Sequence, residues 1–209
     1  MSKLSLKLLP RGGSNRVSQK SFATNQVAGF TMVELVVIVL IIGILSAIAA
    51  PSWFAFTNRQ RLNKASDKIV AALQEAQRQA KLSKRNYSVS FQNNNLPVIA
   101  IHRADTTPTN WQNLGVDVGV QPEQVRLGTN LSDANTLSSP STVAFTNLTT
   151  AKSITFDYMG ILASKTNGSA ADTGLKVVVT LPNSSGIKRC VILETLLGGM
   201  RTGKDTQCN

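Results

Sequence analysis

The chain has 209 residues, enough for one domain of ordinary size and an additional segment. Its net charge of +11 is typical of nucleic-acid-binding proteins, but the charge is unevenly distributed. Five of the 22 basic residues and none of the 11 acidic residues precede position 30, so 17 basic and 11 acidic residues follow, with a net charge of +6. The charge alone is therefore weak evidence for nucleic-acid binding.

The sequence also argues against an enzyme and against a metal centre. It contains no glycine-rich phosphate loop and no HExxH motif. The only histidine, His102, lies in a predicted strand, and zinc would require four ligands. We therefore expect no catalytic residue, no metal and no cofactor.

The first 29 residues form a basic segment, with cations at Lys3, Lys7, Arg11, Arg16 and Lys20. Positively charged flanks of membrane helices stay in the cytoplasm. We therefore predict a cytoplasmic N-terminal side and a C-terminal domain outside the cytoplasm.

Residues 30–56 form an apolar segment with one charge, Glu34, in its first half. About 20 helical residues, each rising about 1.5 Å, span a hydrocarbon core of about 30 Å. A transmembrane helix is predicted. A secretory signal peptide is one alternative, with a small-residue cleavage site at Ala47 and Ala49, and a plain anchor is another. Neither alternative explains the carboxylate of Glu34.

The sequence GFTMVEL at residues 29–35 resembles the processing motif of type IV prepilins. In that family a prepilin peptidase cuts after the glycine and methylates the new terminal amine, and the fifth mature residue is glutamate. The resemblance implies cleavage between Gly29 and Phe30, N-methylation of Phe30 and an assembly role for Glu34. It also implies other pilin or pseudopilin subunits, an inner-membrane assembly platform and membrane lipid as partners.

A physical argument supports the assembly role of Glu34. A charged side chain within a membrane costs about 2.5–3.5 kcal/mol or more, so it needs a partner. Cleavage would create an ammonium group at Phe30, which the Glu34 of a neighbouring subunit can neutralise in the apolar filament core. The pair would also set the axial register of the subunits.

Residues 57–85 are predicted to continue the helix as an amphipathic half. The apolar positions recur at spacings of three and four, at Leu62, Ala65, Ile69, Leu73, Ala76 and Ala80. No strong breaker separates Trp53 from Arg85, so one long helix is expected, with Gly43 and Pro51 as flexible or kinked points. Its basic face is interpreted as solvated or as facing lipid headgroups.

Residues 86–209 are predicted to form a globular β-rich domain. Alternating apolar residues at 87–91 indicate a strand that ends at the turn-prone residues 93–95, and residues 105–123 are expected to form a long loop. Further strands are predicted at 97–102, 124–127, 142–145, 153–157, 175–181 and 187–195. The fold class is therefore α+β, with a long N-terminal helix packed on an antiparallel sheet, as in pilins.

The C-terminal third contains the segments 154–160, 176–180 and 189–193 and a glycine-x-arginine triplet at residues 199–201. These segments resemble the closing segments of the GspH/FimT group of minor pilins and pseudopilins. The resemblance implies a minor pilin that supports pilus assembly and DNA uptake, or a GspH-type pseudopilin of a type II secretion system. A membrane-anchored domain without a filament is the third alternative, and gene neighbourhood would separate the first two.

Two further expectations concern the C-terminal end. Cys190 and Cys208 are predicted to form a disulfide, because the domain is expected outside the reducing cytoplasm. Four cations, Lys188, Arg189, Arg201 and Lys204, are candidate DNA-binding residues with weak, sequence-independent affinity. The alternative is that they are ordinary solubilising charges, since Glu194 and Asp205 are close in the sequence.

Overall fold

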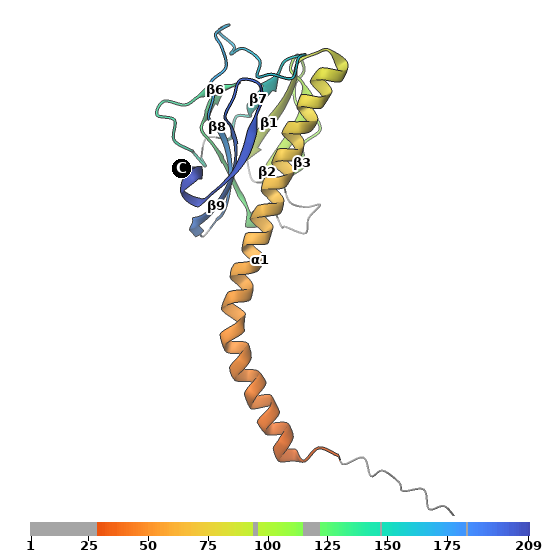
Figure 1. The fold of residues 1–209 in the computed structure, drawn as a ribbon, viewed down its shortest axis with the longest axis vertical. Helices are drawn as coiled ribbons and strands as arrows, with labels where there is room; N and C mark the ends of the chain where they lie inside the picture. Colours follow the sequence, from red (N-terminus) through yellow and green to blue (C-terminus); the bar gives the residue numbers. More distant parts are fainter. Residues whose placement is uncertain (1–28, 94–95, 115–121, 147, 183) are drawn as a thin grey trace, which may run out of the picture. The chain divides into compact units, whose positions relative to one another are not determined.

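The computed structural model describes residues 29–93, 96–114, 122–146, 148–182 and 184–209 (Figure 1). All of the predicted leader except Gly29 lies outside these residues. The chain divides into two units, Met1–Ser46 and Ala47–Asn209. The predicted segments 1–29, 30–56, 57–85 and 86–209 follow processing and membrane boundaries, which this division does not test.

In the first unit, helix α1 (Met32–Ser83, 52 residues) begins directly after Thr31. The Thr31 hydroxyl accepts a hydrogen bond from the Glu34 backbone N–H at 3.2 Å, as N-terminal capping residues do. Glu34 lies in the first turn, where a carboxylate complements the helix dipole. The sequence is therefore well suited to start a helix immediately after the predicted cleavage site.

The second unit contains the rest of α1 and two four-stranded antiparallel sheets. The first sheet has the order β3-β2-β1-β7, with bounds Gln112–Asn113, Pro97–Arg103, Tyr87–Asn93 and Lys152–Phe156. The second has the order β10-β9-β8-β4, with bounds Met200–Lys204, Ser184–Leu193, Leu175–Leu181 and Arg126–Thr129. A small hairpin pairs β5 (Leu131–Asp133) with β6 (Thr136–Leu137), and 3₁₀ turns cover Pro122–Gln124 (η2) and Asp205–Cys208 (η3).

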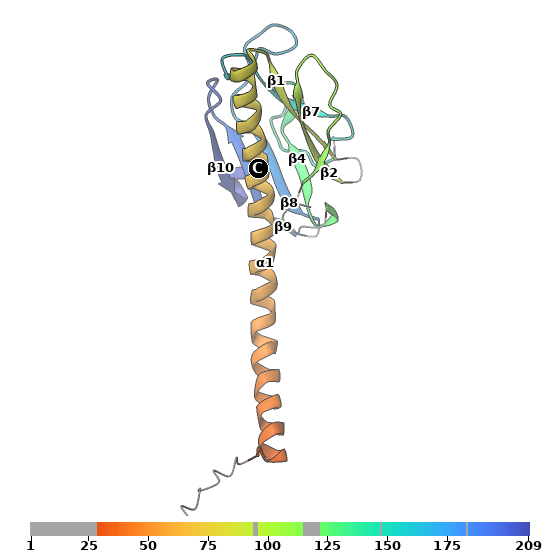
Figure 2. The same ribbon diagram turned by 90° about the vertical axis from the view of Figure 1, so that its right-hand side faces the viewer.

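One core joins the amphipathic half of α1 to both sheets. The buried helix positions include Leu62, Ile69 and Leu73, and they belong to the same cluster as Phe91 of the first sheet and Leu193 of the second. Figure 2 looks onto α1, with β10 on one side of the helix and β1, β2 and β7 on the other. Burial of large apolar side chains provides the main driving force for this arrangement. The α+β class predicted from the sequence is confirmed.

Most of the predicted strands are confirmed within a few residues. The strand at 175–181 coincides with β8, and those at 97–102, 153–157 and 187–195 correspond to β2, β7 and β9. The strand expected at 124–127 begins later, at Arg126, because Gln124 ends the turn η2. Within the expected loop 105–123, Gln112 and Asn113 form β3, whereas residues 115–121 lie outside the described residues.

The predicted strand at 142–145 is wrong. Only Ala144 makes an isolated bridge, with Thr129. Val143 and Phe145 are apolar because they pack on the outer face of the second sheet, next to Val178 and the disulfide. The apolar residues at 143 and 145 therefore alternate because they pack against the sheet, although they do not form a strand of it.

The C-terminal strand β10 is not among the strands predicted from the sequence. Gly203 pairs with Cys190 on β9, and a Cβ at Gly203 would lie 2.9 Å from the Cys190 sulfur. The glycine is thus required for a close approach between β10 and the disulfide. Its role is packing in a sheet.

Candidate functional site

The predicted cleavage site lies in an exposed, non-helical segment. Gly29 and Phe30 precede α1, and 73% of Phe30 is exposed. A Cβ at Gly29 would meet no atom within 4 Å. A peptidase can approach this backbone without unfolding a helix, and Glu34 is exposed one helical turn farther along.

The helix half that follows this segment is apolar on all sides. Every residue from 29 to 54 is exposed, including Leu35, Val36 and Leu40. Among the described residues, α1 is the helix that is long and apolar enough to cross a membrane. A helix of this kind is stabilised by lipid or by other helices packed around it.

The second candidate region is the disulfide and its surroundings. Cys190 and Cys208 are bonded, with Cα atoms 5.6 Å apart, and both side chains are fully buried. The bond joins β9 to the turn η3, and the terminal Asn209 accepts a 2.6 Å hydrogen bond from the Lys188 ammonium. The predicted disulfide is confirmed, and it ties the C-terminal turn to the sheet.

The four candidate DNA-binding cations lie on opposite faces of the second sheet. Lys204 pairs directly with Arg189, and Arg201 pairs with Ile192. Successive residues of a strand point to opposite faces, so Arg189 and Lys204 share the face toward α1, whereas Lys188 and Arg201 share the outer face. The structure therefore brings the cations together as two separate pairs.

Three of these cations already have partners. The Arg189 side chain is only 11% exposed, and its guanidinium donates to Asn63 Oδ1 at 2.7 Å and lies 3.5 Å from Asp205 Oδ1. Arg201 forms an ion pair with Glu194. Lys188 binds Asn209 as described above and lies 5.9 Å from the centre of the Phe145 ring. Glu194 and Asp205 are close to these cations in the sequence, but only the fold determines which carboxylate pairs with which cation.

A polar pocket of about 240 Å³ lies between α1 and the β9–β10 pair. Its lining residues are Asn63, Ser66, Asp67, Arg189, Thr202, Gly203 and Lys204. Ser66, only 3% exposed, has no hydrogen-bond partner for its hydroxyl within the described part of the chain. The lining carries both signs of charge, because Asp67 faces the same pocket as the two cations.

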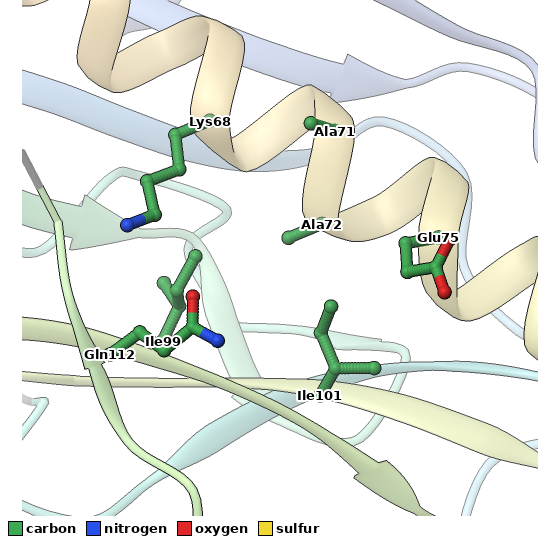
Figure 3. Close-up of a pocket in the computed structure, with 7 residues that line it drawn as sticks. All are labelled: Lys68, Ala71, Ala72, Glu75, Ile99, Ile101 and Gln112. Carbon is green, nitrogen blue, oxygen red and sulfur yellow. The ribbon is translucent and has the colours of Figure 1, made fainter. Parts of the chain in front are cut away.

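An apolar groove of about 230 Å³ lies on the other side of α1 (Figure 3). Lys68, Ala71, Ala72 and Glu75 of the helix face Ile99, Ile101 and Gln112 of the first sheet. Arg78 binds the Glu75 carboxylate at 2.6 and 2.8 Å. Hydrogen bonds from Arg78 and then Gln79 lower the pKa of Glu75, and Glu75 in turn raises the pKa of Arg78. The carboxylate is thus held ionised at the rim of the groove.

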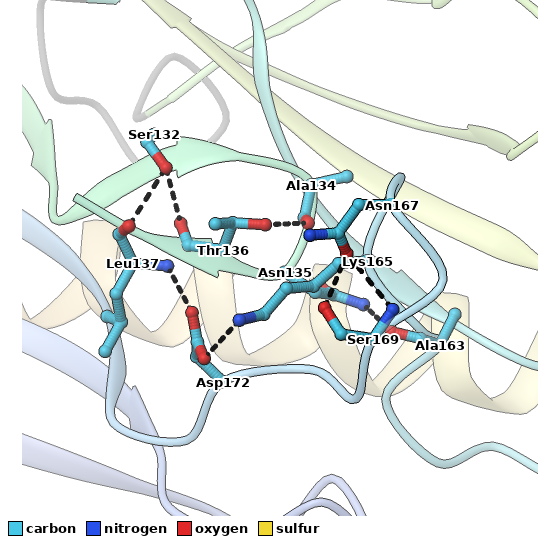
Figure 4. Close-up of polar contacts among 10 residues, drawn as sticks. All are labelled: Ser132, Ala134, Asn135, Thr136, Leu137, Ala163, Lys165, Asn167, Ser169 and Asp172. Atoms are coloured by element: carbon cyan, nitrogen blue, oxygen red, sulfur yellow. Dashed lines mark hydrogen bonds and ion pairs between the residues drawn. The ribbon is translucent and has the colours of Figure 1, made fainter.

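Polar contacts around the buried Asn135 hold the loops beside β5 and β6 in place (Figure 4). Asn135, at φ 49°, donates to the carbonyls of Thr155 and Ala163 at 2.8 and 2.7 Å. Lys165 contacts Asp172 at 2.5 Å, and Asp172 also accepts from the Leu137 N–H at 2.8 Å. These two hydrogen bonds, the Lys165 bond first, lower the pKa of Asp172. The network connects the loop after β7 to the β5–β6 hairpin, which is a structural role.

The described residues contain no group of three or more His, Cys, Asp or Glu side chains that could hold a metal ion. Among the described residues that line the polar pocket and the apolar groove, no nucleophile is paired to a base. Two regions remain as candidate functional sites. One is the exposed N-terminal segment with Gly29, Phe30 and Glu34, and the other is the C-terminal turn closed by the Cys190–Cys208 bond.

Comparison with known proteins identifies the N-terminal segment. Residues 24–50 match the family model described as the prokaryotic N-terminal methylation motif. The match includes Gly29, Phe30 and Glu34, and it supports a type IV pilin-like precursor. Among curated proteins and among solved structures, no match to the chain was found.

Proposed function

We propose that this type IV pilin-like precursor matures into a minor type IV pilin, a membrane-anchored filament subunit that supports pilus assembly. The observation that carries the proposal is the methylation motif at residues 24–50, joined directly to a helix half that is apolar on every side. Such a half needs either lipid or other helices around it. A filament subunit uses both, lipid before assembly and neighbouring helices afterwards.

The proposed maturation follows the chemistry of the motif. Prepilin peptidase cuts the peptide bond after Gly29, which frees the amine of Phe30, and then methylates that amine. The leader stays on the cytoplasmic side and the domain lies outside the cytoplasm, anchored in the inner membrane. At the assembly platform, Glu34 of one subunit pairs with the Phe30 ammonium of its neighbour, so that neither charge is left alone in an apolar core.

A GspH-type pseudopilin of a type II secretion system is the second candidate. The glycine-x-arginine triplet at residues 199–201 favours the GspH/FimT group, but it does not distinguish the minor pilins of that group from its pseudopilins. The minor pilin is preferred because the C-terminal end is cationic and is closed by the Cys190–Cys208 bond. The ion pairs of Arg189 and Arg201 reduce the charge that this end can offer to a ligand.

DNA binding is a further part of the proposal, with phosphate contacts and no base recognition. Lys204 is exposed on the α1 side of the second sheet, and Lys188 and Arg201 lie on the outer side. One duplex would not engage both sides at once. Binding should therefore be weak, independent of sequence and sensitive to salt.

A deletion strain tests the proposal directly. Its piliation, protein secretion and DNA uptake would be compared with those of the parent strain and of the complemented strain. Loss of pili with normal secretion is expected for a minor pilin. Normal pili with defective secretion would instead identify the pseudopilin, and two normal phenotypes would exclude both filaments.

A further inference from the structure

Two loops beside the C-terminal end of α1 present large apolar side chains to solvent. Tyr158 and Met159 follow β7 and are 50% and 52% exposed, and Leu196 and Leu197 connect β9 to β10 and are 44% and 74% exposed. We call these four residues the tip patch. Single exposed apolar residues are common on protein surfaces, but a cluster of this kind marks a candidate interaction site.

The two loops lie side by side. The Leu162 N–H donates to the Leu196 carbonyl at 2.8 Å, which joins the chain after β7 to the β9–β10 connection. The Gln77 amide of α1 donates to the carbonyl of Gly160 at 2.6 Å and to that of Leu197 at 3.4 Å. One helix side chain thus holds both loops, and the two exposed apolar pairs of the tip patch lie on neighbouring loops.

The patch is preformed. The Asp157 carboxylate accepts from the Met159 N–H at 2.8 Å, and the Thr195 carbonyl accepts from the Gly198 N–H at 3.0 Å. Gly160 and Gly198 adopt φ values of 80° and 78°, a conformation that glycine adopts without strain. Loops fixed in this way lose little conformational entropy when a partner binds.

The patch has a positively charged rim. Lys81, Lys84 and Arg85 are exposed at the end of α1, and none of them forms an ion pair with another described residue. Of the nearby carboxylates, Glu194 is paired with Arg201, and Asp157 accepts the backbone N–H groups of Met159 and Ile161 in its own loop, so the three cations remain in excess. A partner that covers the patch must therefore bring negative charge around an apolar centre.

We propose that the tip patch docks the globular domain of a second, non-identical pilin-like subunit, whose apolar contact surface is ringed by carboxylates. This inference rests on the proposed function, because the methylation motif implies assembly with other pilin subunits. A second copy of this chain is a poor occupant, since the residues after position 29 carry a net charge of +6 and would repel the cationic rim. The loops of the tip patch are already fixed before binding, so they can match a partner surface that is also folded before binding.

A site-specific photo-crosslinker tests the contact in the full chain. The crosslinking residue would replace Met159, and in the control it would replace Ser141, which is exposed in the segment between β6 and the Thr129–Ala144 bridge. In cells of the native host, the Met159 adduct should be identified by mass spectrometry as another chain with an N-terminal methylation motif and an acidic domain. The Ser141 position should give little of this adduct.

Substitutions in the same background sharpen the result. Leu197→Asp places a charge at the centre of the patch and should lower the yield of the Met159 adduct about tenfold, as expected at a hot spot. Leu197→Met keeps the volume and should stay within about twofold. Lys84→Glu should also lower the yield. Unchanged thermal unfolding of the Leu197→Asp chain would show that the domain remains folded.

The outcomes separate the docking inference from the proposed function. Sheared filaments would be probed for the chain in parallel with crosslinking. A chain that enters filaments without a Met159 adduct overturns the inference alone. A chain that is absent from filaments overturns the proposed function, and the inference with it. The inference is also contradicted if the Met159 adduct contains lipid, a second copy of the chain or a protein without the methylation motif. Equal adduct yields from the Met159 and Ser141 positions would contradict it as well.

Discussion

The two halves of α1 have similar length and opposite surroundings. Residues 29–54 bury nothing within the chain, whereas eight residues between Leu62 and Ala80 are buried against the two sheets. The amphipathic half has its partner in the same molecule, and the apolar half must find its partner in lipid or in other subunits. Mutations should therefore affect assembly in the first half and the stability of the domain in the second.

The largest expected effect is on assembly, for Glu34→Ala. The variant should lose most or all incorporation into filaments, because the Phe30 ammonium of a neighbour would remain unpaired in an apolar environment. Cleavage should persist, so intact-mass measurement should still show loss of residues 1–29 and one added methyl group.

Glu75→Ala is the matched control, since Glu75 is a glutamate of the same helix in the domain half, and it should enter sheared filaments normally. Normal incorporation of Glu34→Ala would remove the assembly role. A mature terminus near Ala50 would indicate an ordinary signal peptide instead.

A pair of leucine substitutions tests the comparison within the helix. Leu73 is fully buried, so Leu73→Ala should destabilise the domain by about 2–5 kcal/mol. Leu40→Ala, in the exposed apolar half, should leave domain unfolding unchanged. Denaturant unfolding of the detergent-solubilised chain, followed by near-UV circular dichroism, measures both. An equal loss of unfolding free energy in the two variants would contradict the assignment of domain stability to the amphipathic half of α1 alone.

Removal of the disulfide should have the next largest effect on stability. The bond closes a loop with a sequence separation of 18. In the chain-entropy model a loop of this size contributes about 3 kcal/mol, so the Cys190→Ser, Cys208→Ser double variant should unfold at correspondingly lower denaturant. Alkylation of both thiols in unreduced wild-type material would show that the bond does not form in the cell.

Asp172→Asn should destabilise the domain by about 1 kcal/mol at neutral pH, because two hydrogen bonds to the carboxylate are lost or weakened. The pKa of Asp172 is lowered in the folded protein, so the carboxylate stabilises the fold above its unfolded pKa of about 3.9. That contribution is lost as pH falls through the lower folded pKa, and the difference between wild type and variant should shrink there.

Thermal unfolding between neutral and acidic pH would show this convergence. Asp105→Asn is the control, because Asp105 forms an exposed pair with Arg103 and should have little effect. A pH-independent difference between wild type and Asp172→Asn would mean that the carboxylate is not the stabilising group.

The smallest expected effect concerns DNA. Arg201 and Lys204 lie on opposite faces of the second sheet, so one duplex can contact only one of them at a time. The variant with both replaced by Gln should therefore flatten the plot of log affinity against log salt by about one unit, and the single variant on the bound face should account for all of that change. Arg126→Gln, an exposed cation on β4, is the control. An unchanged slope would exclude these two residues as DNA contacts.

Much of the fold could be predicted because its signals are local. The period of three and four between Leu62 and Ala80 predicts a helix with one buried face, and that face is the one the sheets cover. Alternation predicts β1, whereas β8 is a short run of consecutive β-branched residues that is buried on both faces. Alternation misleads at 142–145, where Val143 and Phe145 cover the outer face of the second sheet without joining it.

The sequence by itself determined the anchor, its carboxylate, the cleavage motif and the pairing of the two cysteines, since each depends on residue type and spacing along the chain. Only the tertiary structure decided which face of the second sheet carries each cation, and that the loop after β7 lies beside the β9–β10 connection. These features follow from strand register and from loops that meet across long sequence separations. A shift of register by one residue would exchange the faces, and no local pattern specifies that choice.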